Sequence, residues 1–347
     1  MKRRTALQAI AALGLSPGFA YGRDGDVSDF GGRKNPNPTA KPLRKNHPWI
    51  AGAGKNSNVF LWKFYEHVAQ TPFIPHYQLK DGDGLGDCVG QATAAAVDML
   101  MASEIVLLKQ PEKWVAKASI EAIYGGGRIE IGQDLHDRNY VSPNGMLVDY
   151  AIEYVKAYGI LHRINYATQG HDLREYSIPR CREWAMSGVP DELEPLAKQH
   201  PVQQHSNVKD FDALSDAIAA GQPVIIGSTY AVKDTRDGEG FGELYTGGGT
   251  YYRRGRFWSI ARTKWYHCMA FIGIRNGTDR PGALLLNSHG PNWISGPKSF
   301  GQPEGSCWLT PEHVNLMLGD WDEGYAISAY KGHPGSRIEK IKKHRLF

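Results

Sequence analysis

Three polar residues from two distant parts of the chain could together perform cysteine chemistry. Cys88 follows the glycine-rich stretch GDGLGD and opens a run that is rich in alanine. His267 begins the apolar stretch HCMAFIGIR, and Asn287 directly follows the apolar stretch GALLL. A cysteine nucleophile needs a lowered thiol pKa, a base within reach, and a group that orients this base. We therefore take Cys88, His267 and Asn287 as candidates for these three roles.

The elements that must position these residues can be predicted from the spacing of apolar side chains. Residues 88–108 have alanine and larger apolar residues at helical spacing and no proline, which predicts a helix that begins at Cys88. The unpaired amides and the macrodipole of a helix start favour a thiolate there. Residues 267–275 and 282–290 are short, apolar and bounded by turns, which predicts two strands. If these strands are adjacent, Asn287 can hold one tautomer of His267.

The remaining pattern divides the chain into a helical part and a part made mostly of strands. Residues 145–160 predict an amphipathic helix that ends near Gly159, and residues 210–230 predict a helix, a glycine stop and a strand. We interpret Gly125–Gly127 and Gly247–Gly249 as turns. A helical lobe followed by a β lobe is an α+β arrangement, with a cleft between the lobes.

Four segments, in this order, resemble the papain-like cysteine peptidases over about residues 75–330. GDGLGDCVGQATAAA resembles the family's glycine-flanked cysteine at a helix start, and SPNGMLVDYAIEYVKAYGI resembles its Asn-Gly-Gly stretch with the helix that follows. YHCMAFIGI resembles the histidine strand, and NSHGPNWISGPKSFGQPEGSCWLT resembles the Asn-Ser-Trp segment with its glycine-rich turn. Any one of these motifs is weak alone, whereas four in order are specific for the fold.

The resemblance implies a two-lobed fold, with a helical lobe and a β-barrel-like lobe, and a cysteine endopeptidase that works through an acyl-thioester. It implies Cys88 as nucleophile, His267 as general base and acid, and Asn287 as the group that orients His267. The backbone at Asn144 and Gly145 would pair with an extended polypeptide substrate, and Trp293 would also line the substrate site. The family needs no metal and no cofactor.

Three positions depart from the family pattern. Gly82 stands where the family has a glutamine that donates to the oxyanion; the candidate donors here are Gln78 and the Cys88 backbone amide. Asp87 replaces the usual serine before the cysteine, and its charge would oppose thiolate formation. His289 replaces a tryptophan of the Asn-Ser-Trp segment. The chain also has no segment as long as the family's inhibitory propeptide.

These departures leave two other functions open. A papain-like domain that is weakly active or inactive, and is kept for binding or assembly, would be consistent with Gly82, Asp87 and His289. A cysteine amidase or cell-wall hydrolase is suggested by the Asp-Cys pair at residues 87–88, although that class lacks the NSHGPNW segment.

The N-terminus has the features of an export signal. Residues 1–20 combine Lys2, Arg3 and Arg4 with a short apolar run and small residues near Ala20, which favours twin-arginine export to the periplasm or the medium. Residues 21–56 are rich in Gly, Pro, Asn and basic residues, which predicts an extended linker. The papain-like domain is then expected over 57–347, with a helical lobe at about 75–200, a β lobe at about 201–330 and a basic tail at 331–347.

Composition excludes several other classes. The net charge of +4 is too small to indicate nucleic acid as the main partner. The four cysteines form no CxxC pair, so we expect no structural zinc; whether Cys181 and Cys307 pair stays open. No other apolar run approaches the length of a membrane span. Residues 251–267 mix basic and aromatic side chains and fit an inserted hairpin somewhat better than a substrate-gripping flap.

Overall fold

The computed structural model describes residues 32–33, 51–78, 85–108, 114–132, 144–246, 249–253, 256–260, 267–321 and 324–330. The N-terminal signal, most of the predicted linker, Gly82 and the basic tail lie outside these residues. The helices are α2 (Leu61–Ala69), α3 (Cys88–Leu108), α4 (Ile120–Gly126), α5 (Val148–Ala157), α6 (Ile178–Ser187), α7 (Glu194–Ala197), α8 (Phe211–Ala219) and α9 (Pro311–Trp321), with the π-helical turn η1 (Gly127–Ile131) and the 3-10 turn η2 (Ala167–Gln169).

A seven-stranded sheet forms the framework of the β lobe. Its strands run in the order β14 (Ser306–Leu309), β13 (Gly282–Leu286), β12 (His267–Arg275), β7 (Val224–Ser228), β15 (Gly324–Tyr330) and β6 (Val202–Asn207), and β2 (Asn58–Phe60) also pairs with β12. All of these pairs are antiparallel. Over the described residues the sheet is open and does not close into a barrel.

The predicted strand at residues 267–275 is confirmed as β12, whereas β13 ends at Leu286 rather than at residue 290, so that Asn287 follows the strand. β12 and β13 are antiparallel neighbours, with Ala270 opposite Leu286. This register pairs two apolar runs that are buried along their whole length. It brings the start of β12, which is His267, next to the residues that follow the end of β13.

The predicted helices of both lobes are also confirmed. Helix α3 begins at Cys88, as its pattern predicts. Helix α5 begins at Val148 rather than at residue 145, because Met146 and Leu147 form the short strand β3. The predicted helix, glycine stop and strand of residues 210–230 are α8, Gly221 with a φ of +80°, and β7.

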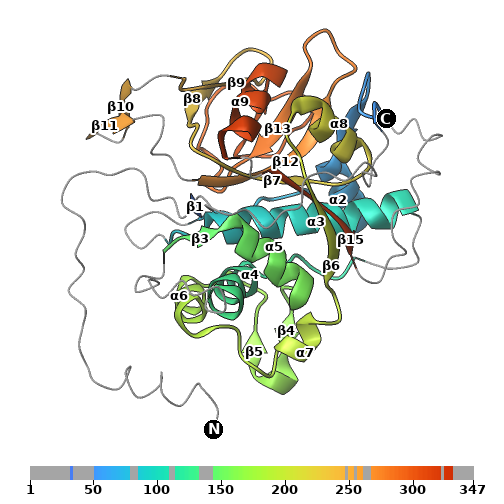
Figure 1. Cartoon of the computed structure of the whole chain (residues 1–347), viewed down its shortest axis with the longest axis vertical. Helices are drawn as coiled ribbons and strands as arrows, with labels where there is room; N and C mark the ends of the chain where they lie inside the picture. The colour runs from blue at the N-terminus through green and yellow to red at the C-terminus, as the bar shows by residue number, and fades with distance from the viewer. Residues whose placement is uncertain are drawn as a thin grey trace.

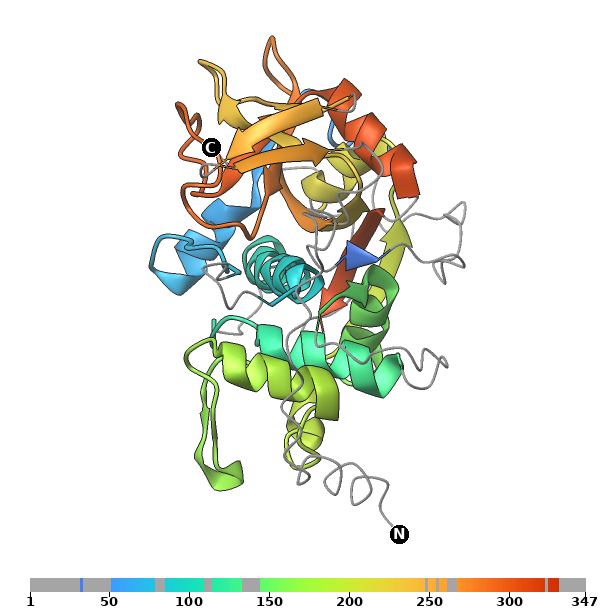
Figure 2. The same cartoon turned by 90° about the vertical axis from the view of Figure 1, so that its left-hand side faces the viewer.

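Helix α3 lies between the two lobes, with the sheet on one side and α4, α5 and α6 on the other (Figures 1 and 2). Ala95, Met99 and Ala102 belong to the hydrophobic core of the β lobe. Other α3 residues, among them Val97 and Leu100, belong to the core of the helical lobe. A helix that is buried on all sides is apolar over most of its circumference, which fits its alanine-rich sequence. Its buried Asp98 is paired with His76 at 2.9 Å.

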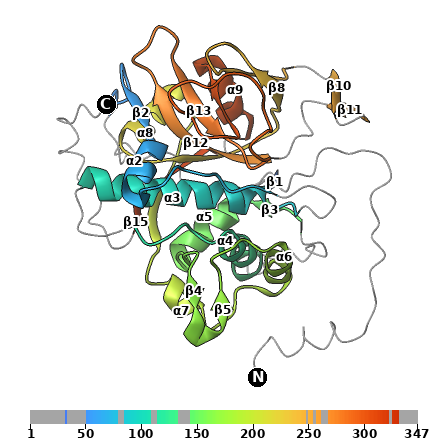
Figure 3. The ribbon, with the colours of Figure 1, turned by 180° about the vertical axis from the view of Figure 1, so that it is seen from behind.

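The N-terminal part of the described chain contacts both lobes. Seen from behind (Figure 3), β2 and α2 lie against the sheet, and Leu61 and Trp62 are fully buried in the β-lobe core. Strand β1 (Gly32–Arg33), within the predicted linker, pairs in parallel with β3 (Met146–Leu147), with Gly32 opposite Met146. The edge of β3 therefore accepts an extended chain segment.

The prediction that Gly125–Gly127 form a turn is wrong. Gly125 and Gly126 end α4, and Gly127 begins η1. A Cβ atom on Gly126 would lie 2.0 Å from the ring of Tyr154, and one on Gly127 would lie 2.5 Å from the sulfur of Met146. The glycines are needed because neighbouring elements pack directly against the backbone.

Short two-stranded pairings complete the fold. They are β4 (Asn165–Tyr166) with β5 (His171–Asp172), β8 (Val232–Arg236) with β9 (Gly242–Leu244), and β10 (Gly249–Arg253) with β11 (Arg256–Ile260). The last pair is antiparallel, so the expected hairpin within residues 251–267 is present, starting at Gly249. None of the described helices is long and apolar enough to cross a bilayer.

The two cysteines whose pairing stayed open do not form a disulfide in this structure. Cys181 lies in α6, in the core of the helical lobe. Cys307 lies in β14, in the core of the β lobe. Each thiol is fully buried in a different lobe.

A buried histidine cluster joins the end of β15 to the helical lobe. The Nε2 atom of His162 lies 3.1 Å from the Tyr330 hydroxyl, and the rings of His162 and His200 are 4.9 Å apart. Burial, aided by the nearby His200, lowers the pKa of His162 to about 4.

This cluster predicts a loss of stability in acid. Unfolded His162 titrates near pH ~6.5, so between that pH and about 4 the unfolded chain binds the extra proton. The contribution of the neutral ring is complete above the unfolded pKa and is lost as the pH falls through this window, by about 3 kcal/mol. We expect His162→Gln to reduce the slope of unfolding free energy against pH, as measured by urea titration. An unchanged slope would contradict this assignment.

Candidate active site

Cys88 is the first residue of α3 and is fully buried. The backbone amide of Cys268, in β12, donates a hydrogen bond to its sulfur over 3.4 Å. The sulfur therefore lies at the contact between the start of α3 and the start of β12. A helix start and an amide donor both favour negative charge on sulfur.

The ring of His267 is held by Asn287. The Nε2 atom of His267 lies 2.7 Å from Oδ1 of Asn287, and the two side chains are 0% and 1% exposed. An amide oxygen at this place requires a proton on Nε2. Nδ1 is therefore the nitrogen of the His267 ring that can exchange a proton with a thiol. The structure thus brings the three predicted residues to one place, since Cys268 directly follows His267.

His289 and Trp293 lie beside this pair. The ring of His289 is tilted against that of His267, with centroids 4.3 Å apart, and the ring of Trp293 meets His289 edge-on at 6.1 Å. Trp293 is only 3% exposed. His289 therefore fills the place that the sequence resemblance gives to a tryptophan. Covering the His267–Asn287 hydrogen bond from water strengthens it.

Asp87 does not face solvent as a free charge. Its Oδ2 atom accepts hydrogen bonds from the Tyr176 hydroxyl over 2.7 Å and from Gln91 Nε2 over 2.9 Å. Burial raises the pKa of Asp87, and the hydrogen bonds from Tyr176, Gln91 and Gln78 lower it by less. The neutral form is thus favoured more than in water, which weakens the expected opposition to a Cys88 thiolate.

Gln78 lies close to the start of α3, although its spacing in the sequence does not match the family. Its Nε2 atom donates to the Leu85 carbonyl over 3.0 Å. Its Oε1 atom accepts from the Ser288 hydroxyl over 2.9 Å, and its backbone amide donates to the Ser288 carbonyl over 2.7 Å. Gln78 is therefore fixed between the residue after Asn287 and the loop before Cys88.

Asn144 and Gly145 lie on the other side of the same loop. The Asn144 side-chain oxygen accepts from the Gly86 amide over 2.8 Å, and the Gly145 amide donates to the Gly86 carbonyl over 3.0 Å. Gly145 has a φ of +84°, which favours glycine there. We refer to residues Asn144–Met146 as the strip. Its distance from the nucleophile position is set by Gly86.

Sequence reasoning missed two tyrosines that support this loop. The Tyr124 hydroxyl donates to the Gly86 carbonyl over 2.9 Å, and Tyr176 holds Asp87. Neither belongs to a motif, and each comes from an element distant in the sequence, so no local pattern could have indicated them. Among the described residues, no group of three or more His, Cys, Asp or Glu side chains is placed to hold a metal ion.

Comparison with known proteins identifies the fold. Xylellain, a cysteine protease from Xylella fastidiosa, superposes with a TM-score of 0.52 at 15% identity, over 88% of this chain and 97% of that chain. Procathepsin B S9 from Trypanosoma congolense gives 0.48 at 10% identity over 87% and 86% of the two chains. Digestive procathepsin L 3 from the Tenebrio molitor larval midgut gives 0.44 at 17%, over 87% and 78%.

No family model matches the sequence, and no curated protein matches it. The likeness to xylellain shows that the chain has the fold of the papain-like cysteine proteases. The resemblance inferred from the four sequence segments is thereby confirmed at the level of the fold. At this identity the likeness does not extend to the reaction, which depends on the site itself.

Proposed function

We propose that the protein is a cysteine endopeptidase, in which Cys88 is the nucleophile, His267 the general base and acid, and Asn287 the residue that orients His267. One observation carries the proposal: the hydrogen bond between His267 Nε2 and Asn287 Oδ1, with the next residue of β12 bonded to the Cys88 sulfur. A papain-like fold is consistent with peptide hydrolysis.

The proposed reaction proceeds through an acyl-thioester. His267 takes the thiol proton at Nδ1, and the thiolate attacks the carbonyl carbon of the substrate. When the carbon–nitrogen bond breaks, the imidazolium gives its proton to the leaving amine. Water, deprotonated by His267, then cleaves the thioester and releases the acid and the thiol.

Two donors are proposed for the oxyanion. The Cys88 backbone amide is at a helix start, where amides have no partner within the helix. The Nε2 atom of Gln78 lies beside the loop that precedes Cys88 and donates to the Leu85 carbonyl and to Asp87, so it would serve the oxyanion by exchanging one of these acceptors for the substrate oxygen. Both groups are neutral donors, which suits a charge that develops only in the transition state.

An extended polypeptide is the proposed substrate. The edge of β3 already pairs with β1, so backbone hydrogen bonding at the strip is geometrically possible. Asn144 and Gly145 would offer backbone groups to the substrate. The expectation that Trp293 lines the substrate site is not met, because Trp293 is 3% exposed and packs in the β-lobe core beside His289.

Covalent labelling at Cys88 tests the proposal. An epoxide or iodoacetamide at neutral pH should modify Cys88 far faster than a free thiol; Cys181 and Cys307 are the internal controls, because they are as deeply buried as Cys88 but lie outside the proposed site. The wild type should cleave an unfolded protein, and Cys88→Ala should not. Slow labelling without cleavage would favour a domain that only binds, and turnover of cell wall without peptide cleavage would favour an amidase.

We also propose that the protein is exported, through the basic and apolar residues 1–20. N-terminal sequencing of the protein recovered outside the cytoplasm should give a chain that starts after about residue 20. Recovery of the full-length chain from the cytoplasm alone would refute export.

A further inference from the structure

Arg128 is a fully buried cation in η1 that the proposed reaction does not use. A charge is buried at high cost unless hydrogen bonds compensate it. Turns of π-helix are rare and occur frequently at functional sites. The contacts of the Arg128 guanidinium should therefore explain why a cation is buried at this position.

The guanidinium bridges α6 and the strip. Its Nε atom donates to the Ala185 carbonyl over 2.9 Å, and its Nη1 atom donates to the Gly145 carbonyl. Its central carbon lies 5.6 Å from the centre of the Tyr124 ring. Arg128 thus contacts both the strip and the tyrosine that holds Gly86.

Gly145 is consequently fixed from two sides. Its amide donates to the Gly86 carbonyl, two residues before Cys88, and its carbonyl accepts from Arg128. Tyr124 donates to the same Gly86 carbonyl. The distance between the strip and the nucleophile position therefore depends on the contacts of Gly86 and Gly145 with Tyr124 and Arg128.

The close approach of η1 to β3 supports this arrangement. A Cβ atom on Gly127 would meet the Met146 sulfur at 2.5 Å, so the backbone before Arg128 packs directly on the strip. The outer edge of β3 pairs with Gly32 and Arg33 of β1. Arg128 thus holds the strip from the inside, while β1 occupies the outer edge of β3 from Met146 onward.

We propose that Arg128 is a positioning residue, which fixes the strip relative to Cys88 so that extended polypeptide substrates are held in register with the nucleophile. This inference rests on the proposed peptidase function. It predicts a specific pattern: a substrate that pairs with the strip depends on Arg128, and a reagent that reaches only the sulfur does not.

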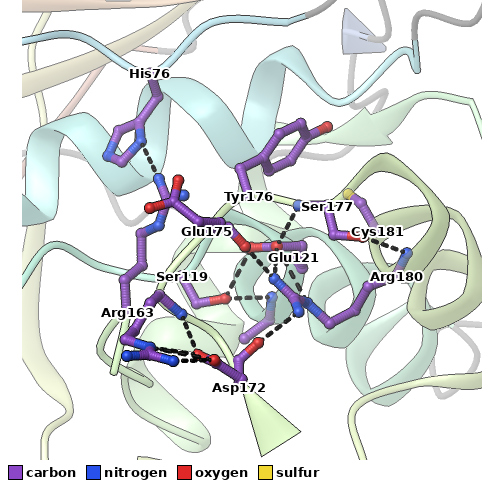
Figure 4. A network of polar contacts seen from close by, with 12 residues as sticks. His76, Ser119, Glu121, Arg163, Asp172, Glu175, Tyr176, Ser177, Arg180 and Cys181 are labelled. Carbon is purple, nitrogen blue, oxygen red and sulfur yellow. Dashed lines mark hydrogen bonds and ion pairs between the residues drawn. The ribbon is translucent and has the colours of Figure 1, made fainter. Parts of the chain in front are cut away.

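The test compares Arg128→Met with Arg180→Met. Arg180 is the control because it is also an arginine of the helical lobe, although 19% of its side chain is exposed. It pairs with Glu121 at 2.6 Å (Figure 4), and its hydrogen-bond partners Glu121, Asp172 and Glu175 lie outside the strip. Arg128→Met should raise KM for a long unfolded peptide about 10-fold with a smaller change in kcat. Alkylation of Cys88 by iodoacetamide should change by less than about 2-fold, because it involves no strip contact.

Arg128→Lys keeps the charge but has no planar fork, so it should give an intermediate KM. If Arg128→Met does not fold, Arg128→Lys carries the same comparison. An unchanged KM in every folded variant, or equal losses in peptide cleavage and alkylation, would overturn the inference. A wild type with neither cleavage nor fast alkylation would instead refute the proposed function.

Discussion

Replacing His267 by alanine should lower kcat/KM for an unfolded protein substrate by on the order of 10⁴-fold or more. Without the imidazole, no group with a suitable pKa is bonded to Asn287, and the thiol loses the base that accepts its proton. The loss should appear mainly in kcat, because the strip is not altered. Steady-state kinetics with a fluorescent peptide measures both constants.

A matched histidine variant separates this effect from a general loss of structure. His313 is half-buried in α9 and lies in the β lobe, as His267 does. His313→Ala should keep kcat/KM within about 2-fold of the wild type, since it removes a similar ring outside the proposed site. Comparable losses in both variants, or full activity of His267→Ala, would contradict the proposed role of His267.

Replacing Gln78 by alanine should lower kcat by on the order of 100- to 1,000-fold. The physical reason is that an oxyanion donor acts on charge that exists only in the transition state, so KM should change little. A purely structural role would instead lower the thermal stability and affect all substrates through the folded fraction. Measuring kcat, KM and the melting temperature on one preparation distinguishes the two.

Gln302→Ala is the control for Gln78. Gln302 is 3% exposed, as Gln78 is, and donates its amide to the Ser306 carbonyl in the same lobe as Asn287. Both variants lose a buried amide, so both should lose some stability. Only Gln78→Ala should lose turnover; an equal kcat in the two variants would remove Gln78 from the oxyanion site.

The sequence predicts the elements that carry the site better than the contacts within it. Helix α3 is a proline-free apolar run of 21 residues, too long for a strand, whereas β12 and β13 are short apolar runs that are bounded by turns. The pairing of His267 with Asn287 was expected if those strands were neighbours, and their register makes them so. Local pattern and tertiary structure agree here.

The environment of the site depends on contacts between residues far apart in the chain. Gln78 bonds to a serine 210 positions away, and Asp87 bonds to Tyr176, 89 positions away. Without these partners, the sequence indicates a charged Asp87 and leaves Gln78 as one candidate among others. The prediction of a turn at Gly125–Gly127 is wrong for the same reason, since only the packing of Tyr154 and Met146 shows why side chains are excluded there.

The position of α3 between the lobes has a consequence for how the molecule opens. Its side chains belong to both hydrophobic cores, so neither lobe can lose its packing without exposing part of α3. The lobes are therefore expected to unfold as one cooperative unit. The amides in the middle of α3, around Val97 and Met99, should exchange with deuterium only through global unfolding. Cys88, the proposed nucleophile, is thus the first residue of a helix whose central amides are expected to reach solvent only when the whole molecule unfolds.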